Sequence, residues 1–157
     1  MTSEIRDLSR EECLELLAAN GVGRLAVSGK DAPVIRPVNY AFDQPSQSVV
    51  FRTAPGSKFY ALLRQNTAAF EVDGIDVERR SGWSVIIVGA TEEVTSPSDV
   101  RRLDGLGLEP WGPGEKAHWV RIRAWTVSGR RISAEAEQAG DAVQAAEAEE
   151  AGEGGPR

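Results

Sequence analysis

Cysteine and histidine are almost absent from this sequence. Cys13 is the only cysteine and His118 the only histidine among the 157 residues. A single thiol excludes an internal disulfide and a cysteine-rich metal site, and a single imidazole excludes a zinc or iron centre that needs two histidines. We therefore predict no metal site.

Long apolar runs are missing as well. The longest one, from Val85 to Ala90, is far shorter than the roughly 20 residues that a membrane-spanning helix needs. Residues 1–10 alternate charged and polar side chains and lack the apolar segment of a signal peptide. We expect a cytoplasmic protein without a membrane partner.

The sequence also lacks an excess of positive charge. It has 18 basic and 24 acidic residues. Residues 134–157 hold seven of the acidic residues and one basic residue, so residues 1–133 carry 17 of each kind. A neutral body without a basic stripe argues against nucleic-acid binding.

Composition divides the chain at the same boundary. Ala, Glu and Gly dominate residues 134–157, which contain no aromatic residue. Such a segment has nothing with which to build a core. We expect one domain over residues 1–133 and an acidic, disordered C-terminal tail over residues 134–157.

The pattern of residues 1–133 is mostly that of short strands. Ser9 and Glu12 have the spacing of a capping box, and Asn20-Gly21 ends the helix that they begin. Alternating apolar residues and turn residues then predict strands at 23–28, 34–42, 48–53, 68–72, 82–94 and 118–127, and short helices at 57–65 and 97–103. Six strands without a βαβ rhythm predict a small, mostly β antiparallel barrel with helices packed outside.

One segment has the residues of a phosphate site. Arg52 and Thr53 end a predicted strand, and Ser57 and Lys58 open a helix after the turn Pro55-Gly56. Two cations, hydroxyl groups and free amide hydrogens at a helix start form a phosphate receptor. A solvated turn in which Ser57 only caps the helix is an equally good interpretation of these residues.

Other segments carry residues suited to a flat aromatic ligand. Pro37 has no amide hydrogen to donate, so its strand lies at a sheet edge or carries a bulge that frees backbone groups. Asn39 can both donate to and accept from a ring edge. Trp83 and Trp111 could cover such a ring. The alternatives are an ordinary edge strand with a surface Arg36, and tryptophans packed in the core or an interface.

The order of these segments resembles the pyridoxamine 5′-phosphate oxidase-like split-barrel flavoproteins. The resemblance covers residues 8–132. It is carried by Gly21-Val22-Gly23-Arg24-Leu25-Ala26, Arg36-Pro37-Val38-Asn39-Tyr40, Phe51-Arg52-Thr53, Gly56-Ser57-Lys58, Gly82-Trp83-Ser84-Val85 and His118-Trp119-Val120-Arg121-Ile122. It implies a six-stranded antiparallel split barrel and a homodimer with two FMN sites at the interface.

The resemblance also implies which residues bind the cofactor. The phosphate of FMN would be held by Thr53, Ser57 and Lys58, with Arg52 beside it. The flavin ring would lie along Val38, Asn39 and Tyr40, on the segment that Arg36 begins. Trp83 and Ser84 would come from the region where the partner chain closes the site.

The chain departs from true pyridoxamine-phosphate oxidases at the end of the domain. Trp125 to Arg131 provides no equivalent of the arginine and histidine with which those enzymes grip the vitamin. The wider family has members that use a deazaflavin and others that handle haem, for which His118 is a candidate ligand or an ordinary structural histidine.

The resemblance therefore implies an FMN-dependent oxidoreductase that acts on a small-molecule substrate or electron acceptor, with the electron chemistry supplied by the cofactor. The alternative is a non-catalytic flavin, deazaflavin or haem binder. No residue is predicted to be catalytic, because the sequence shows no nucleophile–base set and no paired carboxylates.

Overall fold

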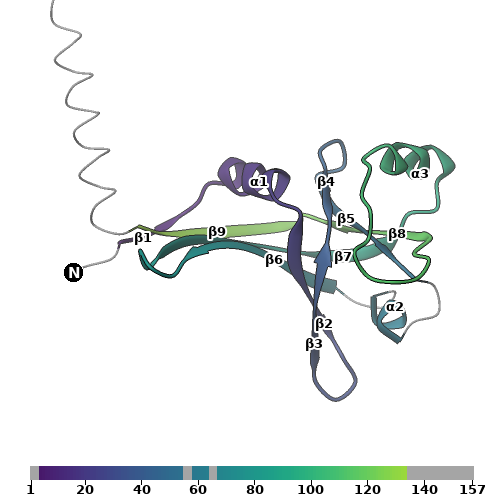
Figure 1. Cartoon of the computed structure of the whole chain (residues 1–157), viewed down its shortest axis with the longest axis horizontal. Coiled ribbons are helices and arrows are strands. Elements are labelled where there is room, and N and C mark those ends of the chain that lie inside the picture. The colour runs from purple at the N-terminus through teal and green to yellow at the C-terminus, as the bar shows by residue number, and fades with distance from the viewer. Residues whose placement is uncertain (1–3, 55–57, 64–66, 134–157) are drawn as a thin grey trace, which may run out of the picture.

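The computed structural model describes residues 4–54, 58–63 and 67–133, which form nine strands and three helices (Figure 1). In chain order these are β1 (Glu4–Asp7), α1 (Arg10–Ala19), β2 (Val22–Ser28), β3 (Pro33–Asn39), β4 (Ala41–Asp43), β5 (Ser48–Thr53), α2 (Lys58–Leu63), β6 (Thr67–Asp76), β7 (Ser81–Glu93), α3 (Pro97–Asp104), β8 (His118–Arg123) and β9 (Thr126–Ser133). Ser57 and the predicted tail, residues 134–157, lie outside the described residues. Within the described ranges, no helix is long and apolar enough to cross a bilayer.

All the strands pair antiparallel, and β7 connects the two halves of the sheet. The strand order is β3-β2-β6-β7-β8-β5-β4, with β9 added to β7 and β1 added to β9. Most of β7 pairs with β6 and β9, and its last residues, Thr91–Glu93, pair with β8. In Figure 1, β1, β9 and the β6–β7 hairpin extend to the left. We call these strands the arm.

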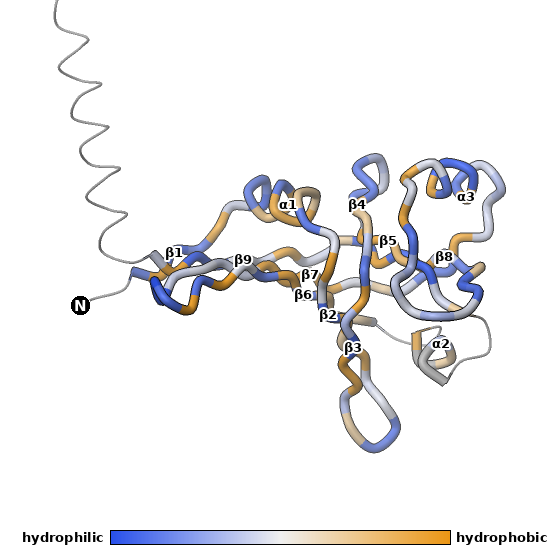
Figure 2. The backbone as a smooth tube through the Cα atoms, viewed as in Figure 1, coloured by the Kyte–Doolittle hydropathy of each residue, from blue (hydrophilic) through white to orange (hydrophobic). Residues whose placement is uncertain are grey.

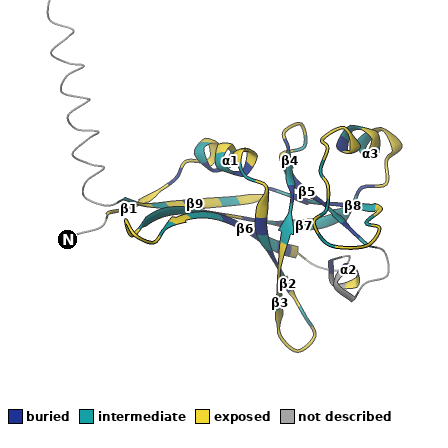
Figure 3. Cartoon of the chain, in the orientation of Figure 1, coloured by how far each residue is buried: buried dark blue, intermediate teal, exposed yellow. Residues whose placement is uncertain are grey.

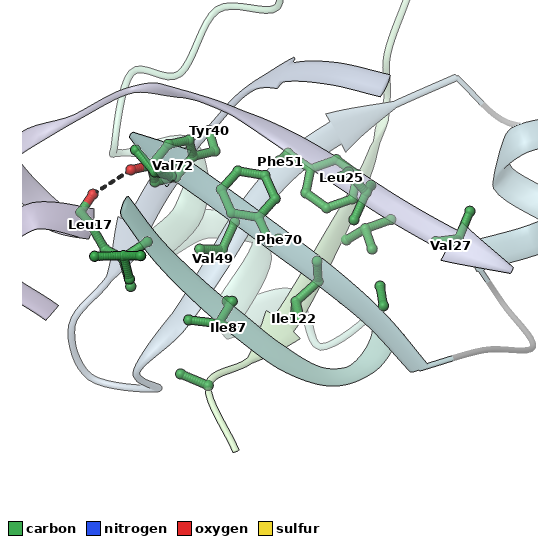
Figure 4. Close-up of a cluster of buried hydrophobic side chains, with 14 of the residues drawn as sticks. Leu17, Leu25, Val27, Tyr40, Val49, Phe51, Phe70, Val72, Ile87 and Ile122 are labelled. Atoms are coloured by element: carbon green, nitrogen blue, oxygen red, sulfur yellow. Dashed lines mark hydrogen bonds between the residues drawn. The ribbon is translucent and has the colours of Figure 1, made fainter. Parts of the chain in front are cut away.

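The main core lies where the strands of the two halves cross. Alternate residues of β2 and β6 are buried, as expected for strands with one face on a core. Figure 4 shows the buried side chains converging from several strands: Leu25, Val27, Val49, Phe51, Phe70, Val72, Ile87 and Ile122. A second cluster, on the other face of β5 and β8, joins Val50, Val94, Leu103 and Trp119 under α3. Figure 3 shows the β2–β3 hairpin tip exposed, in contrast to this centre.

α1 begins at the predicted capping box. The backbone amide of Glu12 donates to the Ser9 hydroxyl at 3.2 Å, and the Glu12 carboxylate accepts from the Ser9 amide at 2.7 Å. The helix buries Cys13 and Leu17 against the sheet. A Cβ atom at Gly129 of β9 would lie 2.6 Å from the Cys13 sulfur, so the absence of a side chain there lets α1 sit directly on the strand. The predicted helix start is confirmed.

Three predicted strands have the wrong extent. The predicted strand 68–72 is β6, which continues to Asp76. The predicted strand 34–42 is two strands, because the chain turns at Tyr40, whose amide donates to the Gly21 carbonyl at 2.8 Å. The predicted strand 118–127 ends at Arg123, and β9 follows after a short turn. Patterning does not predict β1 or β9, since β1 is fully exposed and β9 is mostly polar. The mostly β, antiparallel class is confirmed, with nine strands among the described residues instead of the six predicted.

Pro37 lies on an edge strand and not at a bulge. β3 ends the strand order, which confirms the predicted edge. Its register with β2 runs without interruption from Ser28 opposite Pro33 to Val22 opposite Asn39. The predicted bulge is therefore wrong. A proline on an edge strand needs no bulge, because its nitrogen, which has no hydrogen to donate, can face away from the neighbouring strand.

Candidate functional site

The end of β5 places polar groups on both faces of the sheet. Thr53 lies opposite His118 of β8, and Arg52 lies opposite Trp119. Directly opposed residues of an antiparallel pair point to the same face. Thr53 and His118 therefore share the face that carries the main core, while Arg52 and Trp119 share the face under α3.

Both residues at this strand end carry polar atoms without a partner. Thr53 is only 8% exposed, and its hydroxyl makes no hydrogen bond to any part of the chain that the structure describes. The Arg52 guanidinium lies over the Trp119 ring, 5.4 Å from its centroid. Its Nε is buried and has no acceptor among the described residues. Buried donors are almost always paired in folded proteins. Arg52 Nε, like Arg131 Nε on β9, is therefore a candidate donor to a bound anion.

Two more members of the predicted phosphate group follow in the chain. Lys58 is the first residue of α2, five positions after Thr53. Ser57 precedes it and lies outside the described residues. Arg52 and Thr53 thus lie at the end of β5, and α2 begins five residues further along the chain.

Beside Thr53 lies a cluster that the sequence does not predict. The Nδ1 atom of His118 forms a short hydrogen bond with the Glu93 carboxylate, and the Tyr60 hydroxyl donates to the other oxygen of that carboxylate. The Tyr60 and His118 rings meet edge to face, with centroids 5.5 Å apart. These residues come from β8, β7 and α2, and no spacing in the sequence connects them.

The ring-binding residues predicted on β3 have different surroundings. Arg36 is exposed, and its Nη1 donates to the carbonyl of its neighbour Ile35 at 3.0 Å. Val38 packs against the main core. Beyond them, β3 has no strand on its outer side within the described residues, so its edge can offer backbone groups to a ligand.

Asn39 and Tyr40 are engaged within the protein. The Asn39 side chain donates to the Glu109 carbonyl at 2.6 Å and accepts from the Trp111 amide at 3.3 Å. It therefore anchors the loop that follows α3, which carries the exposed Trp111. The Tyr40 hydroxyl donates to the Leu17 carbonyl at 2.7 Å, and burial raises its pKa. Tyr40 can reach a ligand only through its backbone.

Trp83 and Ser84 lie away from the other candidates, on the arm. Trp83 is opposite Gly74, and a Cβ atom at Gly74 would be 2.6 Å from the indole nitrogen, so the indole lies directly on the glycine. Both residues line a cavity of about 450 Å³. From Trp83 to Glu93, β7 spans about 30 Å when extended. Within one chain, the structure does not bring Trp83 and Ser84 to the end of β5.

Comparisons with known proteins agree with this fold. Residues 9–131 match the pyridoxamine 5′-phosphate oxidase family. An uncharacterised protein of Mycobacterium tuberculosis is 34% identical over 137 residues, which cover 84% of this chain and 88% of that protein.

Two solved structures are similar over most of the chain. One is an FAD-binding protein from Mycobacterium smegmatis, with 34% identity and a TM-score of 0.72 over 82% of this chain and 98% of that one. The other is an FAD-binding protein from Mesorhizobium loti, with 26% identity and a TM-score of 0.67 over 84% and 99% of the two chains.

Proposed function

This chain belongs to the pyridoxamine 5′-phosphate oxidase family, and from that premise we propose that it is a flavoprotein that holds FMN by its phosphate at the end of β5. One observation carries the proposal. The buried Nε of Arg52 has no acceptor among the described residues, and the Thr53 hydroxyl, on the opposite face of β5, makes no hydrogen bond there either. Because β5 ends at Thr53, an anion bound at the strand end can accept hydrogen bonds from both faces.

The residues present fit a phosphate monoester. Arginine donates in a fixed fork, lysine adds a mobile point charge, and a threonine hydroxyl is a short donor. Arg52, Thr53 and Lys58 supply these three kinds of contact within seven residues of the chain, and Ser57 adds a second hydroxyl. The free edge of β3, from Arg36 to Asn39, is the proposed support for the flavin ring.

FAD contains the same phosphate, ribityl chain and ring as FMN, extended by an adenylate. Two similar structures are those of FAD-binding proteins, so FAD is the alternative that a binding experiment must include. In either case the flavin supplies electron transfer, and the protein supplies position and electrostatics. We propose an oxidoreductase that acts on a small-molecule substrate or electron acceptor.

We further propose a homodimer formed through one face of the arm. Ile5, Ile75, Ile86 and Ile132 share that face through their strand pairing and are exposed in the single chain. Ile75 is 69% and Ile5 63% exposed, and Figure 2 shows hydrophobic stretches reaching the tip of the arm. Ser84 shares that face of β7, whereas Trp83 lies on the opposite face. We propose that the pairing of two copies brings this part of one arm toward the flavin site of the other copy.

The direct test of flavin binding is a titration of the purified chain with FMN, FAD and riboflavin, followed by flavin fluorescence. FMN, FAD or both should bind, and riboflavin, which lacks the phosphate, should bind more weakly. Equal affinity for riboflavin and FMN would contradict a phosphate site, and absence of binding by all three would contradict a flavoprotein. Bleaching of bound flavin by a reduced nicotinamide cofactor then tests the oxidoreductase.

A further inference from the structure

We propose that His118 is a phosphate-contacting residue of the flavin site, held in position by Glu93 and Tyr60. This inference rests on the proposed function and adds one contact to it. It follows from the geometry at the start of β8, where His118 and Thr53 are directly opposed across the strand pair. Side chains so opposed have Cβ atoms about 5 Å apart.

His118 is fixed in one orientation by groups from two other elements. Glu93 of β7 binds its Nδ1, and Tyr60 of α2 donates to the second oxygen of the same carboxylate and packs its ring edge against the imidazole. An ionised carboxylate only accepts hydrogen bonds, so the proton of the His118–Glu93 pair is assigned to Nδ1. The Glu93 carboxylate therefore orients the imidazole, as carboxylates do for functional histidines.

The other ring nitrogen is available to a ligand. The His118 side chain is 32% exposed, and its Nε2 makes no hydrogen bond within the described ranges of the chain. When the ring takes up a proton from solvent, Nε2 becomes a donor that faces the same side of the sheet as the unpartnered Thr53 hydroxyl. A phosphate oxygen is an acceptor for both.

The charges around His118 favour this protonated form when an anion is present. Glu93 supplies one negative charge from β7 and Tyr60 a neutral hydroxyl from α2. Arg52, next to Thr53 on β5, points to the opposite face, and Lys58 lies two positions before Tyr60. A bound phosphate adds negative charge beside the imidazole, and opposite charges within a few ångströms stabilise each other.

The experiment uses the fact that the chain has a single histidine. The untagged protein gives one imidazole C2–H signal in proton NMR, and that signal is followed from pH 5 to pH 8.5 alone, with FMN, with riboflavin and with inorganic phosphate. FMN should move the titration midpoint of His118 upward by about one pH unit, which by linkage equals about tenfold tighter binding to the protonated form. Riboflavin should leave the midpoint unchanged, and millimolar phosphate should raise it.

A midpoint that stays in place while FMN binds would overturn the inference, as would an equal shift by riboflavin. If no flavin binds, the proposed function fails, and the inorganic phosphate titration decides alone whether His118 contacts an anion. In a second test, His118→Gln should weaken FMN about tenfold at pH 6 and leave riboflavin unaffected, with Lys30→Gln in the exposed β2–β3 hairpin as the control for charge. Equal FMN affinities of the wild type and His118→Gln at pH 6 would contradict the contact.

Discussion

The ion pairs of individual arginines show which positive charges stabilise the fold. Arg24 pairs with Glu71 at 2.8 Å and Asp73 at 2.6 Å, and Arg102 pairs with Asp43 and Asp99. The acids lie tens of positions away in the sequence for most of these pairs, so patterning cannot distinguish these arginines from Arg52. Only the structure shows that Arg52 has no acidic partner within the described residues.

One prediction at this scale concerns the start of α1. Arg6 and the Ser9 amide donate to the Glu12 carboxylate, and these bonds lower the pKa of Glu12 from 4.5 to about 2. A carboxyl whose pKa is lowered by folding stabilises the folded state above its unfolded pKa, and loses that contribution as the pH falls. Between about pH 4.5 and pH 2, the wild type should therefore lose more stability than the Glu12→Gln variant loses.

Thermal melts of the two proteins at pH 7, 4 and 2.5 measure this difference. Glu11→Gln is the matched control, since it removes a charge from the same helix turn and its side chain makes no hydrogen bond within the described residues. The melting temperatures of wild type and Glu12→Gln should converge as the pH falls. A constant gap between them over this range would show that Glu12 is not responsible.

Elements with strong local signals are the ones that the sequence predicts. The capping box fixes the start of α1, and the apolar alternation of β2 and β6 matches their buried faces. The continuous apolar run of β5 matches a strand that is buried on both faces. β1 and β9 have no such signal, because they gain their stability from pairing to β7 and to each other. The His118–Glu93–Tyr60 cluster likewise depends on how β7 passes from one half of the sheet to the other.

Gly89 lies where β7 passes from one half of the sheet to the other, close to the backbone of β8. A Cβ atom there would lie 1.9 Å from the Arg123 carbonyl oxygen of β8, so Gly89→Ala forces two backbones apart. We expect a loss of about 1–3 kcal/mol in the free energy of unfolding. Gly21→Ala is the control, since its nearest neighbour is 3.8 Å away, and surface changes of this kind stay within about 0.5 kcal/mol. Urea denaturation that gives both variants the same stability would contradict this account of β7.

At the scale of the whole molecule, the family and the mostly β fold are predicted from the order of short motifs. The resemblance also implies the residues of the cofactor site, but in the structure of one chain these residues lie in two separate places. Arg52 and Thr53 are at the end of β5, and Trp83 and Ser84 are on the arm. The proposal that these residues form one site therefore depends on the proposed second copy, which the pattern of a single chain does not place.

The proposed dimer makes a prediction about the arm. Light scattering should report twice the chain mass of 16.9 kDa, and Ile132→Glu should give monomers, because a buried unpaired carboxylate opposes association. The matched control is Leu106→Glu, which changes an exposed apolar residue after α3 and should leave the dimer intact. A wild type that is monomeric at micromolar concentration with FMN present would refute the dimer.

The central claim, that a phosphate site at the end of β5 holds the flavin, is tested most directly with Lys58→Ala. Wild type and variant are titrated with FMN and with riboflavin, and Lys30→Ala serves as the control for charge. Loss of a charge-assisted contact should cost about 1.5–3 kcal/mol, or roughly tenfold to a hundredfold in FMN affinity. Riboflavin affinity should stay the same, because riboflavin has no phosphate. Equal losses for both ligands, or no loss for either, would contradict the claim.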